Sequence, residues 1–260
     1  METAPARPWR YIALVAVLGN VAFSTFHDRL GLVGGRTIAE VTRRHPNLFT
    51  PAGYAFSIWG AIYLAFIAYA VGALMPSQRR VRLHERIAPP LALANALCAL
   101  WVVMYRFEWI SVSVALIVAT LVTGAVMFVR AYDGTLDENL GRAWTVPFSL
   151  FLGWVSVATI ANTTVWLVSV GFDGGPLAPA AWAVILLGVA AALGATFALR
   201  FYDPVIPLVV AWAAVAIAVE QREESVMVLA AAVFTALVSL VASGVAASRP
   251  RRTLTAAHAV

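Results

Sequence analysis

Long apolar runs, separated by short polar or Gly/Pro-rich breaks, dominate the hydropathy pattern of the chain. About 20 apolar residues in a helix cross the roughly 30 Å hydrocarbon core of a bilayer. The pattern therefore predicts an all-α, polytopic membrane bundle of about eight transmembrane helices. The predicted spans cover residues 9–27, 51–75, 88–105, 109–130, 143–169, 178–200, 203–220 and 225–247.

The seventh run, 203–220, is the weakest of the eight. It is short, and it opens with Asp203, Pro204 and Pro207. Proline is tolerated in the first turn of a helix, where its missing N–H has no intrahelical partner. We therefore interpret these residues as start signals of a helix rather than as a break.

Composition excludes a soluble enzyme. The chain is 62% hydrophobic and 12% charged, whereas soluble domains are about 45–50% apolar and about 25% charged. The net charge is +5, and every basic residue is arginine. These arginines gather at the ends of the predicted spans, which is typical of membrane loops, and nucleic acid is not an expected partner.

The distribution of arginine predicts the orientation. If the eight spans place both termini on one side, that side carries twelve arginines and the other side six. Arginine is enriched in cytoplasmic loops. We therefore expect a multi-pass protein of a bacterial-type plasma membrane with both termini in the cytoplasm, although the first loop, 27–49, carries four arginines on the opposite side.

Ionisable groups are absent from the middle of the predicted spans. All thirteen carboxylates and all four histidines lie in loops, in tails or at span ends. Intramembrane charges mark proton and ion pathways, so their absence argues against a pump or a proton-driven transporter. The single cysteine, Cys98, forms no metal-binding cluster, and no catalytic motif is recognised. No metal site and no catalytic residues are predicted.

Aromatic and amide side chains inside the spans are the candidate chemistry. Phe56, Trp59 and Tyr63 follow the spacing i, i+3, i+7 and share one helix face. Asn162 shares a face with Ala158 one turn earlier. Such groups are compatible with packing against lipid or other helices. They also suit a cavity for a flat apolar ligand, which aromatic faces bind and an indole N–H or amide orients.

Two segments resemble the TspO/MBR family of tryptophan-rich sensory or translocator proteins. The segment from Phe49 to Tyr63 resembles the start of the family's second helix. The segment from Trp154 to Trp166 is similar to its fifth helix, with the pattern Trp-x-x-x-Ala-Thr-x-x-Asn-x-x-x-Trp. Trp101 to Tyr105 is a weaker match to the third helix.

The resemblance implies a five-helix TspO-like bundle over residues 1–170, with a cavity capped by the first loop. Residues 171–248 would add three helices and 249–260 a polar tail. The family binds tetrapyrroles and sterol-like lipids, so we expect no obligatory cofactor but a porphyrin or haem-type ligand. The candidate ligand-binding residues are Phe49, Pro51, Tyr54, Phe56, Trp59, Tyr63, Trp101, Trp154, Ala158 and Asn162.

Three functions stay open at this point. The first is a sensory protein that binds a flat apolar ligand, to which the resemblance adds porphyrin degradation in some members. The second is a transporter of a small neutral or lipophilic substrate. The third is a docking role for the helices over 178–247, whose small residues allow close helix approach. Membrane lipid and a hydrophobic small molecule are the expected partners, and a homodimer is left open.

Overall fold

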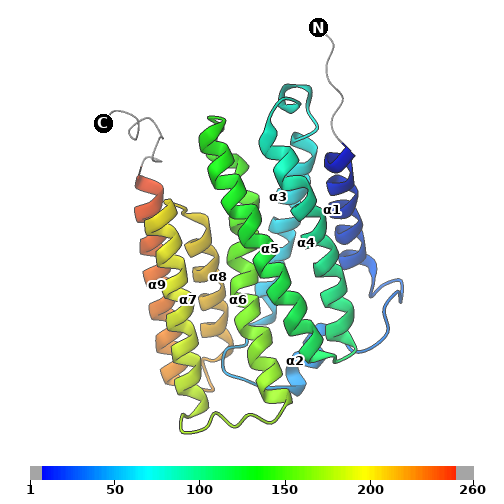
Figure 1. Cartoon of the computed structure of the whole chain (residues 1–260). Coiled ribbons are helices and arrows are strands. Elements are labelled where there is room, and N and C mark those ends of the chain that lie inside the picture. The colour runs from blue at the N-terminus through cyan, green and yellow to red at the C-terminus, as the bar shows by residue number, and fades with distance from the viewer. Residues whose placement is uncertain (1–7, 250–260) are drawn as a thin grey trace.

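The computed structural model describes residues 8–249 as an all-helical bundle (Figure 1). Seven helices are long and apolar enough to span a membrane, and α8 is a shorter apolar helix, which confirms the predicted bundle of about eight spans. The predicted tail lies outside the described residues apart from Arg249. The α-helices are α1 (Pro8–Phe26), α2 (Ile38–Arg44), α3 (Ile58–Gly72), α4 (Arg82–Arg106), α5 (Ile110–Asp137), α6 (Val146–Ser169), α7 (Pro179–Phe201), α8 (Val205–Glu220) and α9 (Val226–Ser248), with 3₁₀ turns η1 (Gly53–Ser57), η2 (Pro76–Gln78) and η3 (Arg142–Trp144).

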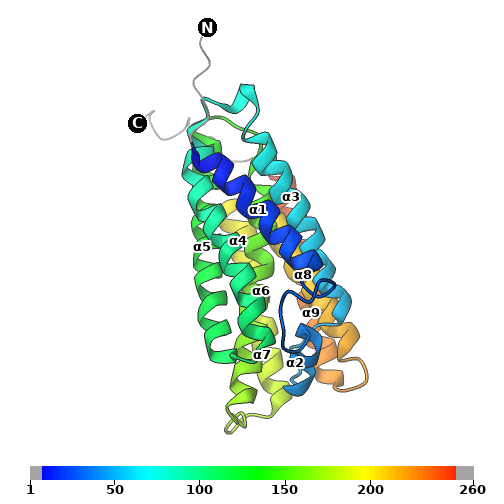
Figure 2. The ribbon, with the colours of Figure 1, turned by 90° about the vertical axis from the view of Figure 1, so that its right-hand side faces the viewer.

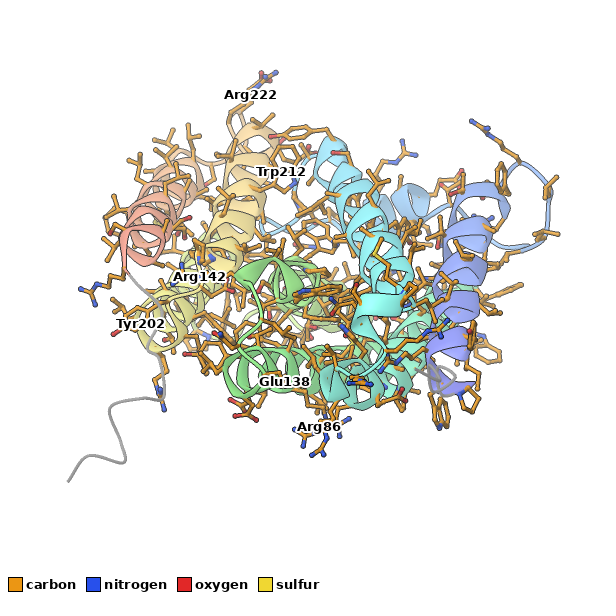
Figure 3. All side chains as sticks on the ribbon, turned by 90° about the horizontal axis from the view of Figure 1, so that it is seen from above. Arg86, Glu138, Arg142, Tyr202, Trp212 and Arg222 are labelled. Atoms are coloured by element: carbon orange, nitrogen blue, oxygen red, sulfur yellow. The ribbon has the colours of Figure 1, made fainter. Side chains whose placement is uncertain are left out.

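The helices run roughly along one axis, so that α1 begins and α9 ends at the same end of the molecule (Figures 1 and 2). Viewed along the bundle, α7, α8 and α9 group on one side of α6 (Figure 3). Small residues bring neighbouring helices close together. A Cβ on Gly153 of α6 would lie 3.0 Å from the Val209 side chain of α8, and one on Gly124 of α5 would lie 3.2 Å from Phe151. Such close contact is how membrane helices gain packing energy.

Helix α8 starts where the sequence predicts, and Asp203 is the reason. Its Oδ1 accepts hydrogen bonds from the main-chain N–H groups of Val205 and Ile206, both at 2.9 Å. Its Oδ2 accepts from the Ser149 hydroxyl at 2.6 Å. A carboxylate at this place satisfies N–H groups that lack an intrahelical partner and complements the helix dipole. The start-signal interpretation of this segment is confirmed.

The start of α4 corrects the predicted span 88–105. The helix begins six residues earlier, at Arg82, and runs through Pro89 and Pro90. Because Pro90 has no N–H, the Arg86 carbonyl loses its intrahelical partner, and the Arg130 guanidinium donates to that carbonyl at 2.7 Å instead. A distant side chain therefore lets the helix continue past a pair of residues that locally predicts its beginning.

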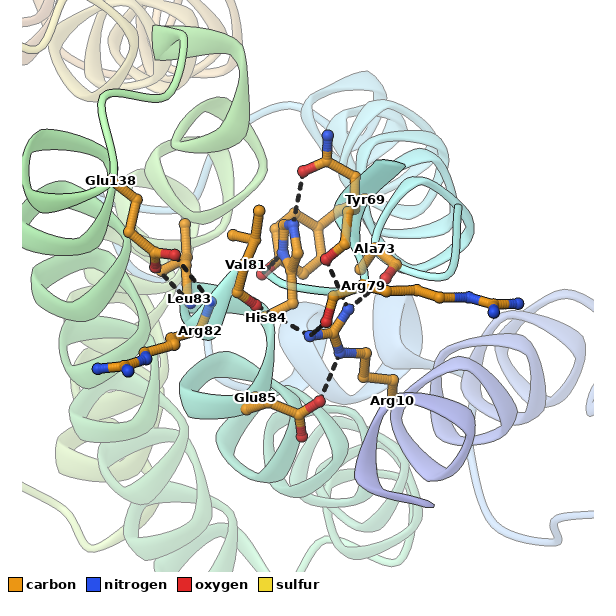
Figure 4. Close-up of polar contacts among 11 residues, drawn as sticks. Arg10, Tyr69, Ala73, Arg79, Val81, Arg82, Leu83, His84, Glu85 and Glu138 are labelled. Atoms are coloured by element: carbon orange, nitrogen blue, oxygen red, sulfur yellow. Dashed lines mark hydrogen bonds and ion pairs between the residues drawn. The ribbon is translucent and has the colours of Figure 1, made fainter. Parts of the chain in front are cut away.

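A buried arginine closes the end of the bundle where α1 begins. Arg10 is 3% exposed and forms an ion pair with Glu85 at 2.7 Å (Figure 4). Its guanidinium also donates to main-chain carbonyls of loop two, which we define as residues 73–81 between α3 and α4. Nearby, Glu138 of the α5–α6 connection accepts from the N–H groups of Arg82 and Leu83, at 2.8 and 2.7 Å. The carbonyls that Arg10 contacts are those of Ala73, Gln78, Arg79 and Val81.

Candidate functional site

Trp154 lies in the middle of α6 and is almost fully buried. Its side chain is 2% exposed, and Phe56 of η1 meets its ring edge-on with centroids 5.7 Å apart. The indole Nε1 is buried and has no hydrogen-bond partner. Buried polar groups nearly always have partners, because an unpaired one keeps the full cost of losing water. This N–H is therefore a donor without a partner among the described residues, on a side chain that lines a cavity.

Helix α3 adds a second aromatic wall. Trp59 and Tyr63 lie one turn apart with ring centroids 5.4 Å apart. Trp59 also contacts Phe151 of α6 at a centroid distance of 6.3 Å. The stripe of Phe56, Trp59 and Tyr63 therefore faces the interior of the bundle, where all three side chains line one cavity.

Helix α4 contributes a third indole, and Asn162 orients it. The Trp101 Nε1 donates to the Asn162 Oδ1 at 2.7 Å, and the Trp101 ring stacks on Tyr105 at 4.9 Å. The amide Nδ2 of Asn162 donates in turn to the Ser113 hydroxyl of α5 at 3.1 Å. Asn162 is 4% exposed, so its amide fixes the ring of Trp101 rather than facing open space.

These walls enclose a cavity of about 720 Å³, which we call the indole-lined cavity after Trp59, Trp101 and Trp154. It is bounded by α1, α3, α4, α5 and α6, by η1 and the two residues after loop one, by Glu220 at the end of α8, and by loop one, which we define as residues 27–49 and which includes α2. Small-molecule sites typically measure about 300–1,000 Å³ and are mostly apolar with a few polar groups. The cavity fits this description.

Seven of the ten residues predicted from the sequence line this cavity, and three lie elsewhere. Phe49 is 1% exposed and lines a neighbouring cavity instead. Tyr54 is 43% exposed and packs against Trp212 of α8 at 5.4 Å. Asn162 does not line the cavity; it accepts a hydrogen bond from the Trp101 indole and lies behind that ring. The seven that line the indole-lined cavity are Pro51, Phe56, Trp59, Tyr63, Trp101, Trp154 and Ala158.

Sequence reasoning missed several polar residues of the wall, of which His27 is the most informative. His27 is 6% exposed, and its Nδ1 lies 3.0 Å from the Phe23 carbonyl. Its Nε2 is buried without a hydrogen-bond partner and lies 3.6 Å from the Asp28 carboxylate. Its place directly after the first apolar run was the available signal. Glu220 also lines the cavity, but it comes from α8, and no local pattern connects it to the aromatic motifs.

Loop one contributes part of the cavity wall and lies at one end of the cavity, so we call it the cover; that it closes the mouth, as the family resemblance implies, stays a prediction. Its helix α2 starts with a capping box: Thr37 Oγ1 accepts from the Glu40 N–H at 3.2 Å, and Glu40 Oε2 accepts from the Thr37 N–H at 2.7 Å. The main-chain N–H and then the hydroxyl of Thr37 hold the pKa of Glu40 below its usual range. Ile38 and Ala39, in the first turn of α2, line the cavity.

The turn between α4 and α5 anchors this cover (Figure 2). Glu108 in that turn pairs with Arg36 at 2.7 Å and with Arg44 at 3.5 Å. The Arg106 guanidinium contacts Asp28 and donates to the Gly34 carbonyl at 3.2 Å. Three of the arginines near this mouth are therefore used to hold loop one in place.

Metal chemistry has no matching cluster in the part of the chain that the structure describes. Over residues 8–249, no group of three or more His, Cys, Asp or Glu side chains lies close enough together to hold a metal ion. What the site offers is aromatic surface, one unpaired indole N–H and one unpaired imidazole nitrogen. This arrangement is suited to holding a ligand.

One of three comparisons with known proteins finds a match. Residues 10–245 match the family model described as TSPO-like protein. No curated protein and no solved structure matches the chain. The family match covers the five-helix part and most of the three helices that follow it. The chain is therefore an integral membrane protein that belongs to the TSPO-like protein family.

Proposed function

We propose that this protein binds a flat, apolar ligand of the tetrapyrrole class in the indole-lined cavity. The observation that carries the proposal is the Trp154 indole N–H, which is buried, belongs to a side chain of the cavity wall and has no hydrogen-bond partner among residues 8–249. A bound ring system with acceptor nitrogens would satisfy this donor. The rings of Trp59 and Trp101 would supply contact area on either side of it.

The polar groups of the cavity wall suit the side chains of a porphyrin, as its aromatic groups suit the porphyrin ring. Arg43 of loop one lines the cavity, and porphyrins carry carboxylate side chains that a guanidinium binds with charge-assisted hydrogen bonds. His27 presents its unpaired Nε2 in the same wall, and imidazole nitrogen is a common ligand of iron. Both free-base and iron-loaded porphyrins therefore belong in the test.

The experiment is a titration of the purified protein in detergent with protoporphyrin, read out by quenching of tryptophan fluorescence. We expect saturable quenching, and Trp154→Phe should weaken binding by roughly three- to tenfold, the equivalent of one hydrogen bond. Trp109→Phe is the matched control, because Trp109 is 60% exposed at the start of α5 and does not line the cavity.

Two results would reject the proposal. One is an unchanged affinity in Trp154→Phe and in a variant that also carries Trp59→Phe. The other is an equal loss in Trp109→Phe, which would mean that porphyrin associates with exposed indoles. Counterflow of a lipophilic solute in liposomes, together with no protoporphyrin quenching, would favour transport instead. Ferric protoporphyrin and His27→Ala then separate an iron-linked from an iron-free ligand.

We also infer that both chain ends face the cytoplasm. The arginine bias supports this, and the four arginines of loop one weigh less because Glu108 pairs with two of them. Cys98 is buried and is the chain's single cysteine, so Cys98→Ala gives a clean background for labelling. In intact cells a membrane-impermeant maleimide should label Glu223→Cys and spare Ser77→Cys; the reverse pattern would overturn the orientation.

A further inference from the structure

A second cavity, of about 800 Å³, lies beside the first and has a different character. Its wall is formed by the end of α2 and the chain that follows it, the C-terminal half of α6, the α6–α7 connection, the start of α7 and the turn between α8 and α9 with Glu220. The start of α7 and the α8–α9 turn belong to the three C-terminal helices, so the five-helix part alone would not form it. We call it the second cavity.

Hydrogen-bond acceptors dominate its polar lining. Thr159, Thr163 and Thr164 of α6 each donate their hydroxyl to a main-chain carbonyl one turn earlier, at 2.7 to 2.9 Å. The Trp182 indole donates to the Gly174 carbonyl at 2.9 Å. Once a hydroxyl has donated its hydrogen, its oxygen can only accept. These five residues therefore leave the cavity with lone pairs in excess of N–H and O–H groups.

Gln221 adds an acceptor that has no hydrogen-bond partner in the part of the chain that the structure describes. The residue is 4% exposed and lines the second cavity. Its Nε2 donates to the Thr50 carbonyl at 3.4 Å, which orients the amide, while its Oε1 is buried and unpaired. An unpaired buried acceptor is costly and rare. A ligand that donates a hydrogen bond would remove this cost.

The charges around the cavity point in the same direction. Three carboxylates line it, those of Asp173, Glu220 and Glu224, against the single guanidinium of Arg43. One oxygen of Asp173 accepts from the Gly175 N–H at 2.9 Å. The excess of negative charge favours a cation over an anion. The remaining wall is apolar and includes Leu48, Leu167 and Leu186.

We propose that the second cavity binds a protonated lipophilic amine. Its ammonium group donates to the Gln221 Oε1 and to the Glu220 and Glu224 carboxylates, while its apolar body lies against the leucines and Trp182. The two cavities share Thr42, Arg43, Thr50 and Glu220 in their walls. The proposal is tested apart from the tetrapyrrole proposal through Gln221 and Glu224, which line the second cavity and not the indole-lined one.

The test compares two ligands that share the apolar body and differ in the polar group, a charged ammonium in one and a neutral hydroxyl in the other. Binding of 2-(2-naphthyl)ethylamine and of 2-(2-naphthyl)ethanol to the full chain in detergent is measured by calorimetry at neutral pH, where the amine is protonated. We expect the amine to bind about tenfold more tightly than the alcohol, as expected for a hydrogen bond between charged groups. Equal affinities would overturn the proposal.

Two variants and one control locate the site. Gln221→Leu and Glu224→Gln should each weaken the amine by about three- to tenfold and leave the alcohol unchanged. Glu223→Gln removes the same charge from the neighbouring residue, whose side chain is 80% exposed and pairs with Arg222; it should leave the amine unchanged. If Glu223→Gln weakens amine binding as much as Glu224→Gln does, the second cavity is not the site. The same conclusion follows if neither Gln221→Leu nor Glu224→Gln alters amine binding. Glu224 lies on an exposed turn, so this variant serves even where Gln221→Leu does not fold.

The two proposals fail separately. The amine measurement contains no tetrapyrrole, so protoporphyrin that does not bind leaves its outcome unaffected. Loss of amine selectivity, in turn, says nothing about Trp154. Amine binding that is weakened by Gln221→Leu but persists in Trp154→Phe would place the two ligands in different cavities.

Discussion

At each end of the bundle a buried arginine lies beneath a loop, and both cavities described above lie at the end that carries loop one. Arg10, at the start of α1, holds loop two, and Arg106, at the end of α4, holds loop one. Both are at most 5% exposed. They differ in how many hydrogen-bond acceptors of the loop their guanidinium groups contact. The Arg10 guanidinium reaches four main-chain carbonyls and a carboxylate, whereas Arg106 reaches two carbonyls and Asp28.

The difference shows how one helical bundle can hold the loop at one end tightly and leave the loop at the other end arched over a cavity. Loop two is short, and one guanidinium donates to four of its carbonyls while it pairs with Glu85 of α4. Loop one is long and is held at separate points on the α4–α5 turn, so it can arch over the indole-lined cavity. Its anchor Asp28 is also half exposed, with 54% of its side chain accessible. Ligand entry is therefore expected at the loop-one end.

The largest effect is expected when the side chain of Arg10, which holds loop two, is replaced. Arg10→Met leaves Glu85 and the loop-two carbonyls without their partner, and breaking a buried ion pair costs about 3–5 kcal/mol. We expect a comparable fall in the free energy of unfolding in detergent, with an intermediate loss for Arg10→Lys. Arg80→Met, at an exposed position in the same loop, is the control. A loss below that of Arg80→Met would mean that Arg10 is not what seals this end.

The next largest effect should appear at the open end, in loop one. Gly35 has a φ of +82°, and a Cβ there would lie 2.4 Å from the main-chain oxygen of Arg106. Gly35→Ala must therefore shift the loop from its anchor, at a cost of about 1–3 kcal/mol. Gly31→Ala also imposes a side chain at positive φ (+60°), but nothing lies within 4 Å of its Cβ. The rate of porphyrin release, measured by stopped flow, should rise more in Gly35→Ala than in Gly31→Ala. Equal rates in the two variants would mean that the docking of loop one on the α4–α5 turn does not control ligand access.

Much of this architecture could be predicted from the sequence, because apolar length sets the spans locally. The eight runs, the Asp203 start signal and the stripe from Phe56 to Tyr63 are all properties of neighbouring residues. The failures come from contacts between distant segments. Arg130 allows α4 to pass Pro90, and Asn162 turns toward Trp101 rather than into the cavity. Neither partner can be identified from local spacing.

The same limit applies to the cavities. Trp59 and Trp154 were chosen because their motifs resemble a family, and both line the cavity. Glu220 and Gln221 were not chosen, since the C-terminal helices show small apolar residues with no chemical pattern. Their place beside loop one depends on how α8 packs, with the Ala52 N–H donating to the Ala216 carbonyl at 3.0 Å. Packing of this kind is decided by the whole bundle.

A third prediction tests the repair of the proline pair at the sealed end. Arg130→Met removes the donor to the Arg86 carbonyl and should cost about 1 kcal/mol. In a Pro90→Ala background residue 90 regains an N–H for that carbonyl, so the same substitution should cost much less. A double-mutant cycle of unfolding free energies measures the coupling directly. Additive effects would show that Arg130 acts through another contact.

The smallest effect concerns the capping box of α2, the part of the cover that depends on its own hydrogen bonds. Since Thr37 lowers the pKa of Glu40 in the folded loop, the stabilisation is complete above the ordinary carboxyl pKa of about 4.5 and is lost as the pH falls through the lower folded value. Porphyrin release should therefore quicken slightly in acid. The ligand's own carboxylates also titrate, so the measured quantity is the difference between the wild-type chain and Glu40→Gln, whose side chain cannot titrate. An identical pH profile in both would mean that α2 does not control release, and that the anchors at Glu108 and Arg106 alone hold the cover closed.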